Sequence, residues 1–338
     1  MLVLWATLWM IPASGRAQVT ETVGTRALGM AGAFVAVADD ATATFWNPAG
    51  LATGPVFDSV VENQEVDTLD PLRQGTGERS FMIAVGTPSL GLTYYRIRTV
   101  AASPGATQPG GQGTSAQEPG LTKLSTHHFG ASLVQSLATF LTVGTTVKGV
   151  RGTAAVGAYP GGTLESALDI ATELEGRTET KMDFDAGVMA VFGPWRVGVV
   201  GRNLSEPKFD LADVNDSANI KLARQVRAGV AYAPRSRPTG TNGPMTIAAD
   251  IDLKHVETPF GERRELAVGG EHWWWGGRVA ARGGIRLNTL RDQFTSQDPV
   301  VAVGGSFSPR TGSLVEGQIT RGRNELEQGW GISARVTF

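Results

Sequence analysis

Apolar and polar residues alternate one by one along most of the chain. At the C-terminal end, Trp330 and Ile332 fall on one face of the alternation and Arg335 on the other. Residues 245–254 and 278–287 repeat the pattern. Because successive side chains of a strand point to opposite faces, alternation of this length predicts β-strands that are apolar on one face and polar on the other.

The same rule predicts about fourteen strands, an even number, as closed membrane barrels of bacteria have. Their expected ranges are 55–63, 79–86, 89–99, 122–136, 138–151, 180–191, 194–203, 221–233, 244–255, 262–273, 276–288, 298–307, 312–321 and 329–338. We therefore expect an all-β fold, a transmembrane antiparallel β-barrel.

The connections between these strands separate into two kinds. Every second link is tight: 87–88, Leu137, Gly193, Trp275 and 308–310. The alternate links are longer and polar: 64–78, 100–121, 152–179, 204–220 and 289–297. Short periplasmic turns and long outer loops distinguish outer-membrane barrels, so the difference also orients the chain. The links 234–243 and 256–261 depart from this rule, the first being too long and the second too short.

Aromatic residues gather beside the predicted periplasmic turns, where a membrane-interface girdle would place them. They are Phe140, Phe192, Trp195, Trp273, Trp274, Trp275, Phe307 and Phe338. For the three consecutive tryptophans, a core cluster or a sugar-binding platform is the alternative interpretation. A soluble periplasmic or secreted β-sandwich would also alternate. Its strands are usually shorter, however, and nothing would sort its loops by length.

The first 54 residues do not follow the strand pattern. Residues 1–17 contain a short apolar run followed by small residues, which predicts a secretory signal peptide; a buried helix or an anchor is the alternative. No later stretch has 18 consecutive apolar residues, so we expect no helical membrane span. Residues 18–54 are rich in alanine and glycine and are interrupted at Asp39–Asp40 and before Pro48. We expect them to form a small helical or irregular plug (a hatch) for the barrel of residues 55–338.

Residues 29–43 (GMAGAFVAVADDATA) and 46–52 (WNPAGLA) resemble the N-terminal hatch signature of FadL-like outer-membrane proteins, closest to their PorV-like branch. The segment 201–207 (GRNLSEP) resembles that branch too. The resemblance implies a fourteen-stranded barrel plugged by the hatch. It also implies that the hatch forms a gate, with Gly29, Gly32, Asp39, Asp40, Asn47, Pro48 and Ala49 as its candidate residues. The terminal Phe338 resembles the end that barrel-assembly machinery recognises.

The resemblance implies two possible functions. FadL-like members carry hydrophobic small molecules, such as long-chain fatty acids or hydrocarbons, across the outer membrane. PorV-like members act instead as surface partners of secreted proteins and transport no small molecule. Outer-membrane lipids, the assembly machinery, a hydrophobic ligand and a secreted protein are therefore the expected partners.

Composition excludes several other classes. The chain has 338 residues, of which 41% are apolar and 18% charged, so it is not a disordered chain. A net charge of −2 gives no reason to expect nucleic acid. There is no cysteine, which excludes a disulfide scaffold, a thiolate zinc site and a cysteine nucleophile. The 44 glycines favour strands and tight turns over helices.

Nothing in the sequence forms an enzyme site. The adjacent His127 and His128 must point to opposite faces of one strand, so they cannot share a metal. Asp39 and Asp40 lack further acids at metal-ligand spacing. The glycines near residue 29 follow no strand and do not form a dinucleotide fingerprint. We expect no catalytic activity, no metal and no cofactor.

Charged residues fall on the polar face of three consecutive strands near the C-terminus, which would line the bore. They are Asp250, Asp252, Glu265, Glu271, Arg278, Arg282 and Arg286. Opposite charges on neighbouring strands pair, so a salt-bridge ladder that fixes the wall and anchors the hatch is one interpretation. A polar lining that guides or repels permeants is the other.

Overall fold

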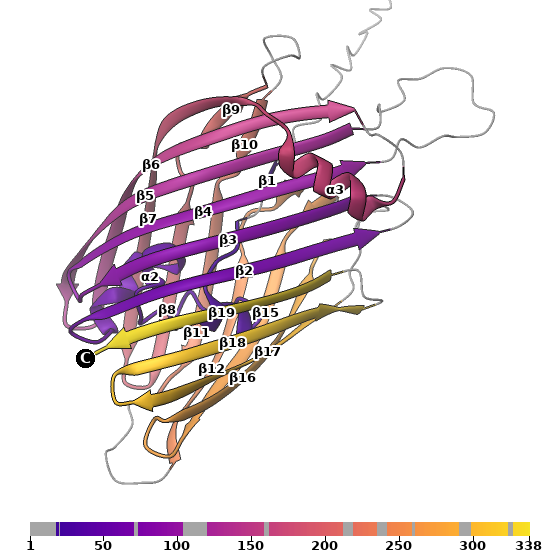
Figure 1. Cartoon of the computed structure of the whole chain (residues 1–338). Helices are drawn as coiled ribbons and strands as arrows, with labels where there is room; N and C mark the ends of the chain where they lie inside the picture. The colour runs from indigo at the N-terminus through magenta and orange to yellow at the C-terminus, as the bar shows by residue number, and fades with distance from the viewer. Residues whose placement is uncertain are drawn as a thin grey trace, which may run out of the picture.

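Fourteen antiparallel strands close into a barrel (Figure 1). The computed structural model describes residues 18–19, 21–70, 74–103, 120–158, 162–211, 219–234, 242–258, 261–290, 299–323 and 327–338. Neighbours around the barrel follow the order β11-β12-β15-β16-β17-β18-β19-β2-β3-β4-β5-β6-β7-β8. The prediction of a closed fourteen-stranded barrel is confirmed, and a two-layered sandwich is excluded.

The barrel has one tall and one short wall. The tall wall consists of β2 (Asp58–Asp70), β3 (Gln74–Gly86), β4 (Leu90–Ser103), β5 (Gly120–Ala138), β6 (Leu141–Ala158) and β7 (Arg177–Phe192). The short wall consists of β8 (Trp195–Arg202), β11 (Gln225–Tyr232), β12 (Asn242–Asp252), β15 (Glu265–Trp274), β16 (Val279–Asn288), β17 (Val300–Arg310), β18 (Ser313–Gly322) and β19 (Glu327–Thr337).

The tall wall corrects the predicted loop at 64–78. Strands β2 and β3 continue through most of that range and pair as far as Asp70 with Gln74. Polar residues occupy most positions on both faces of this segment, so its alternation is weak although its backbone stays extended. Strand β16 is shorter than predicted, because residues 276–278 belong to the turn before it.

The outside of the barrel is apolar around its circumference. Leu133 on the tall wall and Ile319 on the short wall are 65% and 60% exposed. An apolar belt of this extent is stable only against lipid. Within the described residues, no helix has the length and apolar character needed to cross a bilayer.

Aromatic residues lie at the short-turn end, as the sequence predicts. Phe140, Phe192, Trp195 and Phe307 are exposed there, and Phe338 stacks on Phe57 at 4.8 Å where β19 meets β2. Trp273 is an exception, because its indole N–H donates to Glu271 Oε1 at 2.9 Å on the inner face of β15. Its prediction as part of the outer girdle is therefore wrong.

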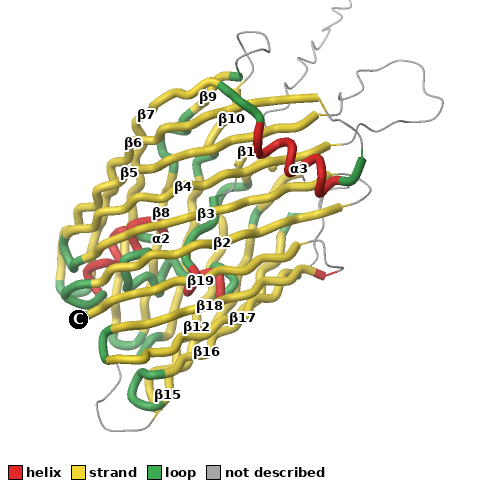
Figure 2. The backbone as a smooth tube through the Cα atoms, in the orientation of Figure 1, coloured by secondary structure: helices red, strands yellow, loops and turns green. Residues whose placement is uncertain are grey.

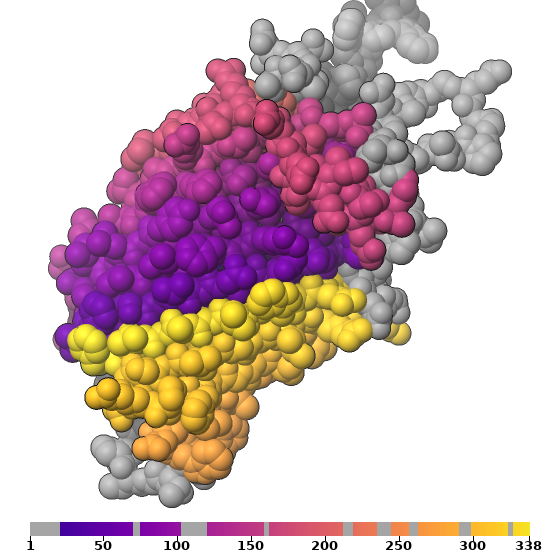
Figure 3. Space-filling view, viewed as in Figure 1, coloured from indigo at the N-terminus to yellow at the C-terminus, as the bar shows by residue number. Residues whose placement is uncertain are grey.

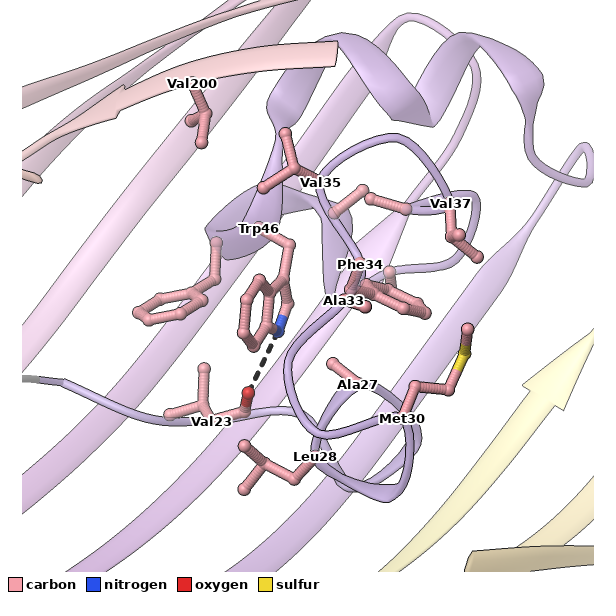
Figure 4. Close-up of a cluster of buried hydrophobic side chains, with 14 of the residues drawn as sticks. Val23, Ala27, Leu28, Met30, Ala33, Phe34, Val35, Val37, Trp46 and Val200 are labelled. Atoms are coloured by element: carbon pink, nitrogen blue, oxygen red, sulfur yellow. Dashed lines mark hydrogen bonds between the residues drawn. The ribbon is translucent and has the colours of Figure 1, made fainter. Parts of the chain in front are cut away.

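The hatch fills the bore near the short turns (Figure 1). It comprises α1 (Thr25–Gly29), α2 (Ala43–Trp46) and the 3-10 helix η1 (Pro48–Thr53), joined by irregular backbone. Its apolar side chains pack on inward-facing residues of the wall, such as Val60 and Met82. Trp46 lies at the centre of this cluster and donates its indole N–H to the carbonyl of Val23 at 2.9 Å (Figure 4).

Further elements lie on either side of the wall (Figure 2). A small sheet of β1 (Gln18–Val19), β9 (Lys208–Asp210) and β10 (Asn219–Leu222) lies within the bore, where Phe209 packs on Leu124 and Val150. Strands β13 (Val256–Thr258) and β14 (Gly261–Arg263) form a hairpin at the outer end of the short wall. Helix α3 (Leu164–Glu173) packs on β3, β4 and β5.

Candidate functional site

Carboxylates of the wall hold the irregular backbone of the hatch. Glu62 accepts the N–H groups of Gly24 and Thr25 at 2.6 and 2.9 Å, and Asp250 accepts those of Phe34 and Val35 at 2.8 Å each. A buried N–H group without a partner is costly, and irregular backbone leaves several of them. Asp250, which the sequence places in the bore, thus contacts the hatch rather than an arginine of the next strands.

Arg26 of α1 lies at the centre of a buried ionic cluster. Its guanidinium reaches Asp39 at 2.7 Å, Asp40 at 2.9 Å and Glu271 of β15 at 2.8 Å. Burial disfavours the charge of Arg26, but Glu271, Asp39 and Asp40 together raise its pKa well above the ordinary value. Burial likewise opposes ionisation of Asp39, yet Arg26 and Arg196 lower its pKa.

The cluster continues along the inner wall. Arg282 lies 3.2 Å from both Glu271 and Glu316, and Arg335 reaches Asp40 at 2.8 Å. Further along, Arg286 pairs with Glu327 and lies 3.4 Å from Glu265, and Asp252 lies 3.2 Å from Arg227. These pairs link β11, β12, β15, β16, β18 and β19 to one another and to the hatch.

Arg278 is a correction to the predicted set. It precedes β16 in the turn that follows Trp275 and is exposed there, outside the cluster. Trp275 has a left-handed φ of 53°, and Gly276 and Gly277 also have positive φ. The backbone therefore reverses before Arg278 rather than carrying it into the bore.

The segment from Asn47 to Ala49 lies against the opposite wall. Asn47 donates to the carbonyls of Val35 and Val188 at 3.0 and 3.1 Å, and Ala49 accepts from Thr142 at 3.2 Å. This approach requires glycine in the wall. A Cβ at Gly144 would collide with the backbone of Pro48 and Ala49, and one at Gly187 with the Asn47 amide.

The two other predicted hatch glycines lie on the side of α1. A Cβ at Gly29 would come within 2.8 Å of the Arg282 side chain, and Gly32 has a left-handed φ of 84°. All seven predicted hatch residues thus lie in the plug. That the hatch moves as a gate stays a prediction.

A second buried ionic cluster, which the sequence did not predict, lies above the hatch. Glu21 lies 3.0 Å from His128 and accepts from Asn203 at 2.8 Å. Lys148 of β6 lies 2.9 Å from Asp185 and 3.1 Å from Asp183. Burial opposes ionisation of Glu21, but His128 and Lys148 bring its pKa down to about 2. This cluster fixes the start of the hatch to the tall wall.

A small hollow lies in the bore between the hatch and the short wall. Its cavity volume is about 30 Å³, well below the roughly 300–1,000 Å³ of small-molecule sites. Its apolar lining comes largely from the hatch, including Leu28, Ala31 and Trp46. The charged lining comes mostly from the wall and consists of Arg202, Arg227, Lys254, Arg263, Arg286, Asp252 and Glu265, with Glu21 from the hatch side.

Arg202 differs from the other arginines that line the hollow. Its guanidinium lies 4.1 Å above the ring of Phe45 and 5.6 Å above that of Trp46. It hydrogen-bonds the amide oxygen of Gln225, but among the described residues it has no carboxylate partner, and its Nη1 atom is buried without a hydrogen bond. Arg202 is thus a buried cation whose charge is not balanced by an ion pair.

Sequence reasoning missed Arg202, Arg26 and Glu21 as site residues. A signal for Arg202 was present, because it follows Gly201 in the predicted strand 194–203, where alternation places it on the polar face. Arg26 and Glu21 lie in irregular backbone, where no period predicts the direction of a side chain.

Solved outer-membrane channels share this architecture. The monoaromatic hydrocarbon channel CymD superimposes with a TM-score of 0.59 at 13% identity, covering 94% of this chain and 97% of that chain. A Pseudomonas aeruginosa FadL homologue gives 0.59 at 13% identity over 95% and 100% of the two chains. The P. putida toluene transporter TodX gives 0.57 at 12% identity over 94% and 98%.

These comparisons define the class of protein. The chain has the fold of an outer-membrane β-barrel channel. More particularly, it has the FadL-like fold of fourteen strands, so the resemblance of its hatch sequence to FadL-like proteins is confirmed at the level of the fold. The comparisons do not show the PorV-like branch.

Comparisons of the sequence reveal less about the protein than the comparisons of structure. The family model described as "F plasmid transfer operon, TraF, protein" matches residues 126–252, which is less than half of the chain. A search of curated proteins finds no match.

Proposed function

We propose that this protein carries hydrophobic small molecules across the outer membrane, with the hollow between the hatch and the short wall as a binding site on the path. The observation that carries the proposal is this small hollow, which combines an apolar floor on the hatch with a bore closed beneath it and would widen to admit a ligand when the hatch moves. An apolar molecule entering from the outer end would reach Leu28 and Trp46 before meeting the short-turn end of the barrel. The similar channels CymD and TodX, which are named for monoaromatic hydrocarbons and toluene, support this class of ligand.

The charges of the hollow favour a long-chain fatty acid over a bare hydrocarbon. Arg202 is a buried cation without a carboxylate of its own, and a ligand carboxylate would supply the missing partner. The rings of Phe45 and Trp46 beside it would contact the first part of an acyl chain. A hydrocarbon would leave that cation unpaired.

Binding of radiolabelled palmitate to the purified barrel in detergent tests this proposal. Arg202→Gln removes the charge and is expected to weaken binding by roughly tenfold or more, because charge-assisted hydrogen bonds are about twice as strong as neutral ones. Arg310→Gln, an exposed change near a short turn, is the matched control and should bind as the unmodified protein does. Equal binding of toluene and palmitate, unaffected by Arg202→Gln, would contradict the carboxylate assignment.

Gating by the hatch is part of the same proposal. The contacts of Arg26 and Glu21 with the wall hold the hatch closed, so transport requires that some of them break. Deletion of residues 24–54 should leave an open pore that conducts ions in planar bilayers, whereas the complete chain should conduct little.

The surface-partner alternative gains no support and is not proposed. A surface partner would be held by the long loops 100–121 and 152–179, of which residues 104–119 and 159–161 lie outside the described residues, as do residues 1–17 of the predicted signal peptide. Recognition of Phe338 by assembly machinery stays a prediction.

A further inference from the structure

The outer surface of the tall wall has basic residues at the level where its apolar belt ends. Inward and outward side chains alternate there, with Arg96 and Arg151 exposed while their neighbours Tyr95, Ile97 and Val150 are buried. Figure 3 views this wall from outside, with α3 across its outer end. The bilayer, rather than the bore, is therefore the environment of these basic residues.

Strand pairing places the basic residues beside one another. Arg96 of β4 lies opposite His127 of β5, which lies opposite Arg151 of β6. One row further out, Arg98 of β4 lies opposite Arg79 of β3. Adjacent strands are about 4.8 Å apart, and like charges directly opposite each other are destabilising. We call Arg79, Arg96, Arg98, His127 and Arg151 the outer basic patch.

The chain itself supplies little counter-charge to the patch. Glu65 of β2 binds Arg79 at 2.7 Å, and Asp67 lies on the same strand one outward position beyond it. His127 contacts the hydroxyl of Tyr94 at 2.9 Å. Among the described residues, Arg96, Arg98 and Arg151 have no ion-pair partner, and Nε of Arg98 is buried without a hydrogen bond.

The surroundings of the patch define its place in the membrane. Tyr94 and Phe129, whose rings lie 4.9 Å apart, border it on the side of the apolar belt. About ten residues of β5 separate Phe129 from the short turn, and nine to eleven tilted residues cross the hydrocarbon core. The patch thus lies at the headgroup level of the outer leaflet.

Helix α3 borders the patch on its outer side. Its buried Ala167, Leu168 and Ala171 cover the outward-facing Val100 and Leu121. Lys123 donates to the carbonyls of Thr172 and Leu174 at 2.7 Å each, so this cation holds the C-terminal end of the helix and is not free for a ligand. The patch is therefore bounded by aromatic rings below and by a helix above.

We propose that the outer basic patch binds the phosphate groups of a lipid headgroup in the outer leaflet. Arginine side chains match phosphate in bidentate geometry, and a phosphate at this level would neutralise cations that the chain leaves unpaired. The lipid tails would lie on Phe129, Tyr94 and the apolar belt beneath. The proposal does not depend on the transport function, because the patch faces the bilayer and not the bore.

Binding of diphosphorylated lipid A to the full-length protein, measured by native mass spectrometry in detergent, tests the proposal. The triple variant Arg96→Gln/Arg98→Gln/Arg151→Gln is expected to bind roughly a hundredfold more weakly, since each basic residue near a charged lipid surface contributes about fivefold. The control Arg177→Gln/Lys181→Gln/Arg310→Gln loses the same charge elsewhere and should retain its affinity.

Two further arms identify the source of the phosphate. Dephosphorylated lipid A and inorganic phosphate should each bind far more weakly than lipid A, because the first lacks the charge and the second the acyl chains. Equal binding of lipid A to the triple variant and to the unmodified protein overturns the proposal, as does equal binding of inorganic phosphate. Heat-modifiable migration on gels verifies that each barrel is folded, and Arg98→Gln alone replaces the triple variant if that one does not fold.

Discussion

The bore and the outer surface of the tall wall both carry arginines, but in opposite electrostatic settings. In the bore, Arg26 and Arg282 each lie within 3.2 Å of a carboxylate of the chain. On the outer surface, Arg96 and Arg151 lie beside another basic side chain instead. Apart from Arg202, these enclosed arginines are balanced by the protein itself, because a buried unpaired ion is expensive. The outer charges are exposed on the surface, where water or lipid can balance them.

Breaking an ion pair in the bore should have the largest effect on the free energy of unfolding. Arg26→Gln leaves Asp39, Asp40 and Glu271 without their common cation, and loss of one partner of a buried ion pair costs about 3–5 kcal/mol. Urea unfolding in detergent, followed by tryptophan fluorescence, should show this loss, and bilayer conductance should rise as the hatch loosens. Arg278→Gln, in its exposed turn, is the control and should change stability by less than about 0.5 kcal/mol. Similar losses in both variants would contradict the assigned role of Arg26.

Adding a side-chain atom at the contact between the hatch and the wall should have an intermediate effect on the free energy of unfolding. Gly144→Ala places a methyl group against the backbone of Pro48 and Ala49, and overpacking costs about 1–3 kcal/mol. Gly149→Ala is the matched control on the same strand, because a Cβ there meets nothing within 4 Å. The two variants are compared by urea unfolding. If Gly149→Ala proves as destabilising as Gly144→Ala, loss of strand flexibility rather than the hatch contact explains the result.

Removing an outer charge should have the smallest effect on stability. Arg96→Gln relieves repulsion from His127 and breaks no ion pair, so the free energy of unfolding in detergent without phosphate lipids should change by less than about 0.5 kcal/mol. Addition of lipid A should stabilise the unmodified barrel more than this variant. A large loss from Arg96→Gln in plain detergent would show that the outer and inner arginines have the same structural role.

The alternation of apolar and polar residues correctly predicted which side chains point into the bore where the strands are regular. It places Arg282 and Arg286 in the bore, where both are buried. It fails at Arg278, which follows a turn whose residues 275–277 have positive φ. The outward assignment of Trp273 came from its position beside that turn, whereas alternation gives it the same face as Glu271, as observed. The two glycines there were visible in the sequence, but only the observed turn shows where the strand begins. Alternation also places part of the outer basic patch, because Arg96 and Arg98 share the outward face of the predicted strand 89–99. The other residues of the patch lie on different strands, so the sequence pattern does not show that they are neighbours.

The sequence by itself determined the barrel, its even number of strands and the presence of a plug. The strands follow from the alternation of apolar and polar residues, and the plug follows from a segment whose sequence cannot form a strand. Only the tertiary structure decided which charges meet. Arg26 and Glu271 are 245 positions apart, and Arg335 and Asp40 are 295 apart. No local pattern encodes such pairs. They form because barrel closure and the folded hatch bring distant segments into one dry space, where every charge needs a partner.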